Sequence, residues 1–82
     1  MSLKKNWLIA EKYMEKELVF QDFREAMSAM LRISYIAEEM NHHPEWSNVY
    51  NKVRIRLTTH DTGGISEKDH ALAERIDALF DQ

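Results

Sequence analysis

The sequence has no cysteine, a single proline and two glycines among its 82 residues. Without cysteine, the chain can form no disulfide, no thiolate metal site and no thiol nucleophile. Proline and glycine are too scarce for a disordered or fibrous chain, and 44% hydrophobic and 30% charged residues are typical of globular proteins. We therefore expect a folded protein whose chemistry depends on side chains other than cysteine.

Long apolar runs and an excess of positive charge are absent as well. No stretch approaches the roughly 18 apolar residues of a membrane span, and the first residues do not contain the apolar segment of a secretory signal. The formal net charge of −3 gives no overall positive field that would attract nucleic acid. We therefore expect a cytoplasmic protein that contacts neither membrane nor nucleic acid directly.

The length of the chain limits its organisation. A chain of 82 residues suffices for one domain but not for two, so we expect residues 1–82 to form a single domain. A domain of this size buries only about 60% of the surface that its unfolded chain exposes. Association with further copies is therefore expected to add stability.

Hydrophobic periodicity predicts the first half of the fold. Residues 7–20 alternate partly between apolar and polar, which favours two strands joined as a hairpin, with the charged run Glu15 to Glu17 as the break. Residues 22–40 change to three- and four-residue spacing, which predicts an amphipathic helix with Asp22 as its N-cap. Its expected apolar stripe is Phe23, Ala26, Met27, Met30, Ile33, Ala37 and Met40.

The second half of the chain repeats this order. "KVRIRLTT", residues 52–59, alternates strictly and predicts a strand, and "WSNV" just before it predicts a shorter one. After two glycines, "SEKD" indicates a capping box with Ser66 as N-cap, followed by a helix to about Phe80. Its expected buried residues are Leu72, Ala73, Ile76, Leu79 and Phe80. The order ββαββα predicts an α+β fold, with two helices on one face of an antiparallel four-stranded sheet.

The histidines are the most conspicuous candidates for a site. His42 and His43 precede the only proline, Pro44, which disfavours helical backbone at His43 and so ends the long helix before the pair. Connections between rigid elements often carry functional groups. Histidine, with an ordinary pKa of about 6.5, can act as either acid or base. The alternatives are exposed loop residues without a function, or a metal hydrolase in which His60 and Asp61 join the pair as ligands, although adjacent side chains converge poorly.

The run "HHPEWSNVYNKVRIRLTTHDTGGISEKDHALAERID", residues 42–77, resembles the pterin-4a-carbinolamine dehydratases. The family pattern is HHPxWxNVYxxVxxxLxTH, then a turn with glycine, a Ser or Thr cap and an Asp three residues later, and the chain matches it in order. The upstream "FQDFREAMSAMLRISYIAEEM" is similar to the first long helix of the family. The resemblance covers most of the chain.

The resemblance implies a dehydratase that converts 4a-hydroxytetrahydrobiopterin to quinonoid dihydrobiopterin and water, recycling the cofactor of aromatic amino acid hydroxylases. It implies no metal or organic cofactor and a homodimer or homotetramer. The implied catalytic residues are His42, His60, His43 and Asp69, and the implied substrate-binding residues are His42, His43, Pro44, His60 and Trp46. A second reading is a pterin-binding or protein-partner regulatory module of the same family with little or no turnover.

Individual roles follow as hypotheses. His42 and His60 are expected to share the proton transfers while His43 helps to hold the pterin ring, and the sequence leaves open which of the first two is the acid. Asp69 has two compatible roles, as the third residue of the capping box or as a carboxylate that orients a histidine or the substrate. Trp46 is expected to be a packing residue or to form a wall of the site.

Overall fold

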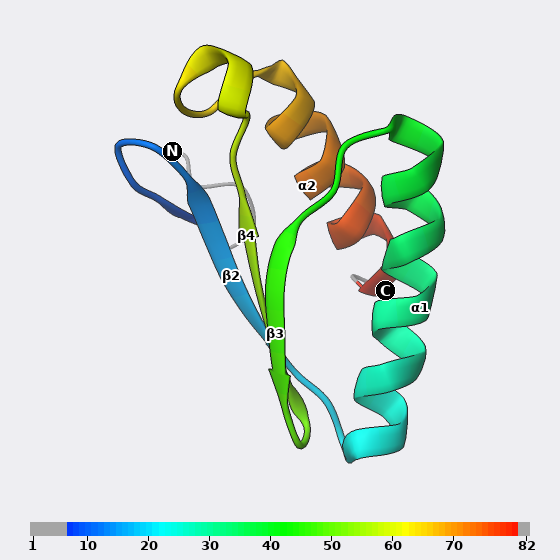
Figure 1. Cartoon of the computed structure of the whole chain (residues 1–82). Helices are drawn as coiled ribbons and strands as arrows, with labels where there is room; N and C mark the ends of the chain where they lie inside the picture. The colour runs from blue at the N-terminus through cyan, green and yellow to red at the C-terminus, as the bar shows by residue number, and fades with distance from the viewer. Residues whose placement is uncertain (1–6, 81–82) are drawn as a thin grey trace.

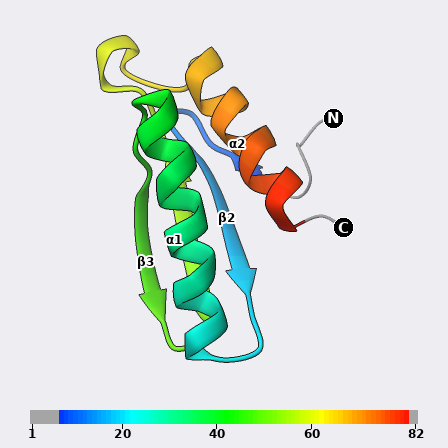
Figure 2. The same ribbon diagram turned by 90° about the vertical axis from the view of Figure 1, so that its right-hand side faces the viewer.

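The computed structural model describes residues 7–80, which form one four-stranded antiparallel sheet and two long helices (Figure 1). The elements are β1 Leu8–Ile9, β2 Met14–Val19, α1 Phe23–Met40, β3 Glu45–Val49, β4 Lys52–Leu57, a 3₁₀ helix η2 His60–Thr62, and α2 Glu67–Phe80. The strand order is β1-β2-β4-β3. Both helices cover the same face of the sheet (Figures 1 and 2). The predicted α+β class and the order ββαββα are therefore confirmed.

The core lies between the sheet and the two helices, and strand β4 supplies its centre. Val53, Ile55 and Leu57 are fully buried, as their alternation predicts. From the helices, Ile33 of α1 and Ile76 of α2 meet them in one hydrophobic cluster. The apolar residues predicted for the second helix all belong to this cluster or pack against it.

The N-terminal hairpin is present, but its predicted break is wrong. The chain turns between Ile9 and Met14, and the run Glu15 to Glu17 lies inside β2. Glu15 pairs in register with Arg56, and its carboxylate lies 3.5 Å from the guanidinium of Arg56 and 3.4 Å from that of Arg54. The charged residues of β2 disfavour a strand by themselves, but their pairing with opposite charges on the neighbouring strand stabilises it.

Helix α1 begins as predicted, with Asp22 accepting a hydrogen bond from the backbone N–H of Glu25 at 2.8 Å. Its buried flank differs from the predicted stripe, because Phe23 is 50% and Met27 is 43% exposed. The residues of α1 that are buried are Ala26, Ala29, Ile33, Ile36 and Ala37. Apolar residues occupy more than one flank of this helix, so periodicity alone did not identify the flank that meets the sheet.

The end of α1 places the histidine pair outside the helix. Asn41 takes a left-handed conformation with φ 53°, and its N–H donates to the carbonyls of Ala37 and Glu38. Asparagine tolerates this conformation better than most residues and commonly ends helices. The pair His42 and His43 therefore lies in the short connection to β3, as expected. Neither α1 nor α2, the two long helices among residues 7–80, is long and apolar enough to cross a membrane.

Candidate active site

A pocket of ≈ 440 Å³ lies where the connection from α1 to β3 meets the end of β4 and the start of η2. This volume is within the range of small-molecule sites. Its lining residues are Asn41, His42, His43, Glu45, Thr58, Thr59, His60, Asp61 and Lys68. The fold thus brings the adjacent pair His42 and His43 to the same pocket as His60, which is far from them in the sequence.

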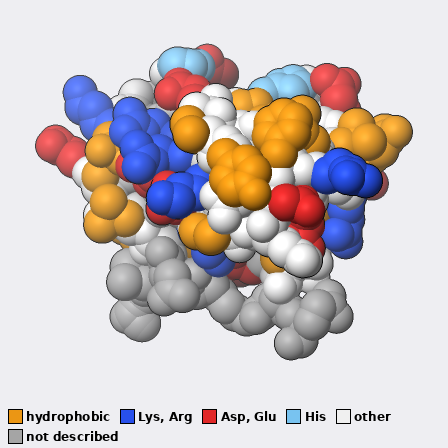
Figure 3. Space-filling view, turned by 90° about the horizontal axis from the view of Figure 1, so that it is seen from below, with side chains coloured by type: hydrophobic (Ala, Val, Ile, Leu, Met, Phe, Trp, Pro, Cys, Tyr) orange, Lys and Arg blue, Asp and Glu red, His pale blue; other side chains and the backbone are white. Residues whose placement is uncertain are grey.

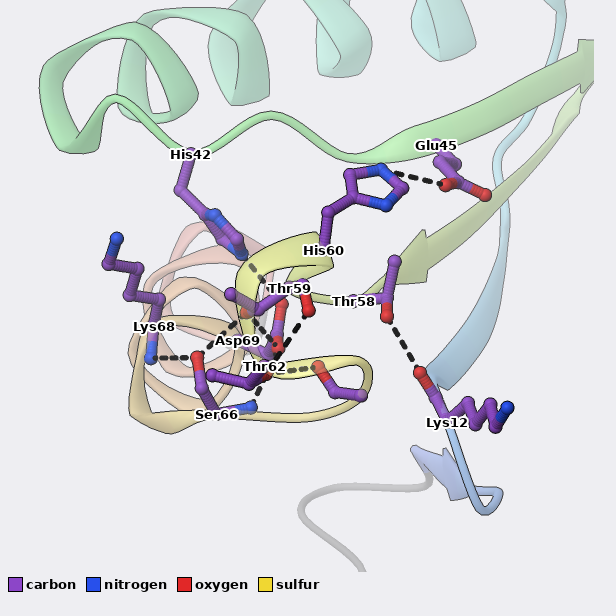
Figure 4. Close-up of polar contacts among 11 residues, drawn as sticks. Lys12, His42, Glu45, Thr58, Thr59, His60, Thr62, Ser66, Lys68 and Asp69 are labelled. Carbon is purple, nitrogen blue, oxygen red and sulfur yellow. Dashed lines mark hydrogen bonds and ion pairs between the residues drawn. The ribbon is translucent and has the colours of Figure 1, made fainter.

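His42 is held from below by a buried carboxylate (Figure 4). Its Nε2 lies 2.6 Å from Oδ1 of Asp69, and the two side chains are 12% and 0% exposed. A carboxylate bonded to one ring nitrogen fixes the orientation and the tautomer of an imidazole. Asp69 is not among the pocket-lining residues. It is therefore connected to the pocket through its contact with His42.

Asp69 also caps the second helix, so the geometry supports both roles considered for it. Its Oδ2 accepts the backbone N–H of Ser66 at 2.9 Å, and Ser66 Oγ accepts the N–H of Lys68 at 3.2 Å. This reciprocal arrangement is a variant of the capping box in which the serine accepts the N–H of the second helical residue instead of the third. The same oxygen also accepts the hydroxyl of Thr59 at 2.7 Å. The start of α2 is thereby attached to the end of β4 and to the histidine loop.

His43 has a different and more exposed environment. Its Nε2 lies 2.9 Å from Oε2 of Glu38, and the two side chains are 55% and 78% exposed. Glu38 was not identified from the sequence. It lies near the end of the helix that precedes His43. Its closeness to His43 in the sequence could have indicated a contact between the carboxylate and the histidine.

His60 is the most exposed of the three histidines at the pocket, with 88% of its side chain accessible. Its Nε2 lies 3.9 Å from Oε2 of Glu45, an ion-pair distance too long for a hydrogen bond. It opens the short helix η2, which ends at Gly63 with φ 72°, a conformation that glycine adopts without strain. His42 is therefore held by a short contact with a buried carboxylate, whereas the contact of the exposed His60 with Glu45 is long.

Two other residues named as substrate-binding are not part of the pocket lining. Pro44 lies between His43 and β3, and Trp46 packs against the hydrophobic core. In the register of the sheet, Trp46 pairs with the buried Ile55. This placement agrees with the packing role considered for Trp46, and its contact with a substrate stays a prediction.

Several lining residues were not identified from the sequence, and Thr59 had the clearest signal. It continues the alternation that buries Val53, Ile55 and Leu57, so its hydroxyl had to enter the protein and find a partner there. Among the residues that the structure describes, Lys68 is the only lysine or arginine in the lining, and nothing in the sequence near it indicated that position.

The fold and the pocket define a class of protein: a small α+β domain whose pocket is lined by several histidines, one of them supported by a buried carboxylate, and histidine is a residue type that can act as general acid or base. Within residues 7–80, no three His, Asp or Glu side chains are grouped as metal ligands would be.

Comparison with known proteins identifies the family. A family model described as "Pterin 4 alpha carbinolamine dehydratase" matches residues 1–79, and the chain belongs to this family. A relative in Prochlorococcus marinus (strain NATL2A) is 48% identical over 75 residues, covering 92% of this chain and 79% of its own. One in Synechococcus sp. (strain WH7803) is 50% identical over 74 residues, covering 90% and 80%. Both are named "Putative pterin-4-alpha-carbinolamine dehydratase".

Solved structures share the fold. A protein from Brucella melitensis described as a transcriptional coactivator/pterin dehydratase superposes with a TM-score of 0.87 at 32% identity, covering 92% of this chain and 82% of its own. A pterin dehydratase-like protein, described as a RuBisCO assembly factor in the alpha-carboxysome, gives a TM-score of 0.76 at 24% identity, covering 89% and 87%. The second likeness concerns the fold alone.

Proposed function

We propose that the protein dehydrates 4a-hydroxytetrahydrobiopterin, or a closely related 4a-hydroxytetrahydropterin, to the quinonoid dihydropterin, and so recycles the cofactor of aromatic amino acid hydroxylases. The observation that carries the proposal is the pair His42 and Asp69, joined at 2.6 Å at a pocket of ≈ 440 Å³ that His60 also lines. Family membership supplies the substrate class.

The reaction needs one proton donor and one proton acceptor. The bond between C4a and the hydroxyl oxygen breaks, and the oxygen leaves as water with a proton from the acid. The base removes the proton of N5, and the electrons of that N–H bond form the C4a=N5 double bond. The proton that the base gains equals the one that the acid loses, so exchange with solvent restores both groups.

His42 and His60 are the side chains proposed for these two steps. Asp69 holds His42 in one orientation, which places a ring nitrogen reproducibly at the pocket. His60 is exposed, and its Nε2 lies 3.9 Å from Glu45, so His60 is proposed to adjust its position against the bound ring. His43, paired with Glu38, is proposed to hold the pterin.

The test is a dehydration assay on the purified protein, with the 4a-hydroxypterin generated in place. Positioned acid–base groups contribute about 10² to 10⁴ in rate, so His42→Ala and His60→Ala are each expected to lose a factor in this range. His70→Gln serves as the matched control, because His70 lies on α2 and is not among the lining residues. Unchanged turnover in both alanine variants would sink the proposal.

The protein is further proposed to form a homodimer or homotetramer. Phe23, Met27, Leu31 and Tyr35 recur at every fourth position of α1, and they are 50%, 43%, 58% and 71% exposed. Hydrophobic side chains also gather near the middle of the face seen from below (Figure 3). Contiguous exposed apolar patches often mark surfaces at which proteins associate.

Light scattering after chromatography tests the proposed oligomer. Leu31→Glu is expected to reduce the measured mass to that of a single chain, and a wild-type monomer would contradict the proposal.

A further inference from the structure

The carboxylate of Asp69 is the centre of a hydrogen-bond network that reaches His42 on one side and Thr59 on the other (Figure 4). Thr59 and Asp69 are 6% and 0% exposed, so solvent has little access to the bonds between them. Ser66 completes the network, with its Oγ 2.7 Å from Oγ1 of Thr59. The position of each proton in this network therefore depends on the protein groups themselves.

With Asp69 ionised, the network has one consistent arrangement of protons. An ionised carboxylate can only accept hydrogen bonds, so the hydroxyl of Thr59 donates its single proton to Oδ2 of Asp69. Thr59 has then no proton left for Ser66, and the Ser66 hydroxyl donates to Thr59. By the same rule, Nε2 of His42 donates to Oδ1 of Asp69. Neutral His42 then has an unprotonated Nδ1.

Thr59 is well placed to hold this arrangement, because both the N–H and the carbonyl of its backbone are hydrogen-bonded to Gly64. Its N–H donates to the carbonyl of Gly64 at 2.8 Å, and the N–H of Gly64 donates back at 3.2 Å. A β-branched side chain also has few χ1 rotamers. The hydroxyl is thus presented to Asp69 from a rigid position, one residue before His60.

We propose that Thr59 is a positioning residue for the dehydration: its hydroxyl holds the Asp69 carboxylate so that neutral His42 keeps its proton on Nε2 and offers Nδ1 to the substrate. This inference rests on the proposed function and deepens it. Thr59 acts through Asp69 and His42, and the bond it supplies is a charge-assisted one in a buried place, where such bonds have their largest effect.

The experiment compares Thr59→Val, which removes the hydroxyl at nearly constant shape, with Thr59→Ser, which keeps it. We expect Thr59→Val to lower kcat about ten-fold with KM nearly unchanged, since a hydrogen bond to a charged group is lost, and Thr59→Ser to retain most of the rate. Thr62→Val is the matched control. Its hydroxyl lies 3.1 Å from the backbone carbonyls of Thr59 and Gly64, which share its one proton, and does not contact Asp69, so kcat is expected to stay within about twofold.

The second readout is nitrogen NMR of the labelled imidazoles, with the His42 signals assigned by their loss in His42→Gln. Wild-type His42 is expected to be the Nε2–H tautomer, and Thr59→Val is expected to populate the Nδ1–H form. A wild-type protein with the proton on Nδ1 overturns the inference even if no variant folds. So does a Thr59→Val protein with wild-type kcat and tautomer. Absence of turnover in the wild type would defeat the proposed function, whereas the tautomer measurement would still decide the role of Thr59.

Discussion

Helix α2 carries two buried aspartates with very different surroundings. Asp69, in the first turn, contacts a histidine and two hydroxyl-bearing residues, and no lysine or arginine among residues 7–80 pairs with it. Asp77, later in the same helix, accepts the indole N–H of Trp7 at 3.0 Å and the ammonium of Lys16 at 2.8 Å. Lys16 also lies 5.8 Å from the centre of the Trp7 ring. One carboxylate is thus matched by a ring that can change its protonation, and the other by a cation that keeps its charge.

The position along α2 adds to this difference. The N-terminal end of a helix favours negative charge and the C-terminal end opposes it, by up to about 1 kcal/mol near the surface. Asp69 therefore gains from the helix itself, whereas Asp77 depends on Lys16. A buried carboxylate with a permanent counter-ion stabilises the packing of the elements that it contacts. Asp77 on α2 contacts Lys16 of β2 and Trp7, which precedes β1. A buried carboxylate with a titratable partner at a pocket is suited to chemistry.

Asp69→Asn is expected to produce the largest effect, on rate. The amide oxygen can still accept from Ser66 and Thr59, which turns the NH₂ group toward His42 and favours the wrong tautomer of the ring. We expect kcat to fall by about 10² or more, with Tm nearly unchanged because the cap is kept. The dehydration assay and a thermal melt measure both. A large fall in Tm that accompanies the loss of rate would show that Asp69 stabilises the fold and has no separate role in the reaction.

Asp77→Asn is expected to have the opposite signature. It leaves the ammonium of Lys16, whose side chain is 16% exposed, without its carboxylate. Breaking a buried ion pair costs about 3 to 5 kcal/mol, and the partial exposure of Lys16 reduces our expectation to about 2 kcal/mol of unfolding free energy, or roughly 10 °C in Tm. Urea titration measures it, and kcat should stay within about twofold of wild type at a temperature where the variant is folded. A variant as stable as wild type would remove the assigned role of Asp77.

The sequence predicted one of these two aspartates and not the other, for a physical reason. Asp69 belongs to a local capping pattern and to a dense motif, so neighbouring residues alone identify it. Asp77 matters only because the fold brings Trp7 and Lys16 to it, from the other end of the chain. Contacts across such separations leave no spacing signal in a single sequence.

The same distinction explains the rest of the comparison between sequence and structure. The helices, the alternation in β4 and the histidine connection depend on neighbours in the chain, and they were predicted. The continuity of β2 through Glu15 depends on Arg54 and Arg56 of another strand, and the buried flank of α1 depends on where the sheet lies. In the pocket, the three histidines were predicted, whereas the contact of Thr59 with Asp69 required the turn at Gly64.

A double-mutant cycle on Lys16 and Asp77 is expected to give a smaller effect than Asp77→Asn: a coupling of about 1 to 2 kcal/mol in the free energy of unfolding. A protein often tolerates the replacement of both members of a buried ion pair by apolar side chains of similar volume. The double variant Lys16→Met/Asp77→Leu should therefore be more stable than Asp77→Leu alone, and should keep its kcat. If the two single changes add without coupling, the 2.8 Å contact contributes nothing measurable to stability.

Ser66→Ala should produce the smallest effect, and it tests whether the Asp69 region also contributes to stability. The variant loses the acceptor for the Lys68 N–H, which costs about 1 kcal/mol for a typical N-cap. The backbone N–H of Ser66 and the hydroxyl of Thr59 still reach Asp69, so the orientation of His42 should persist and kcat should fall less than about threefold. A larger loss of rate would mean that the Ser66 hydroxyl directs the Thr59 proton, and the hydroxyl pair rather than Thr59 alone would then position the carboxylate.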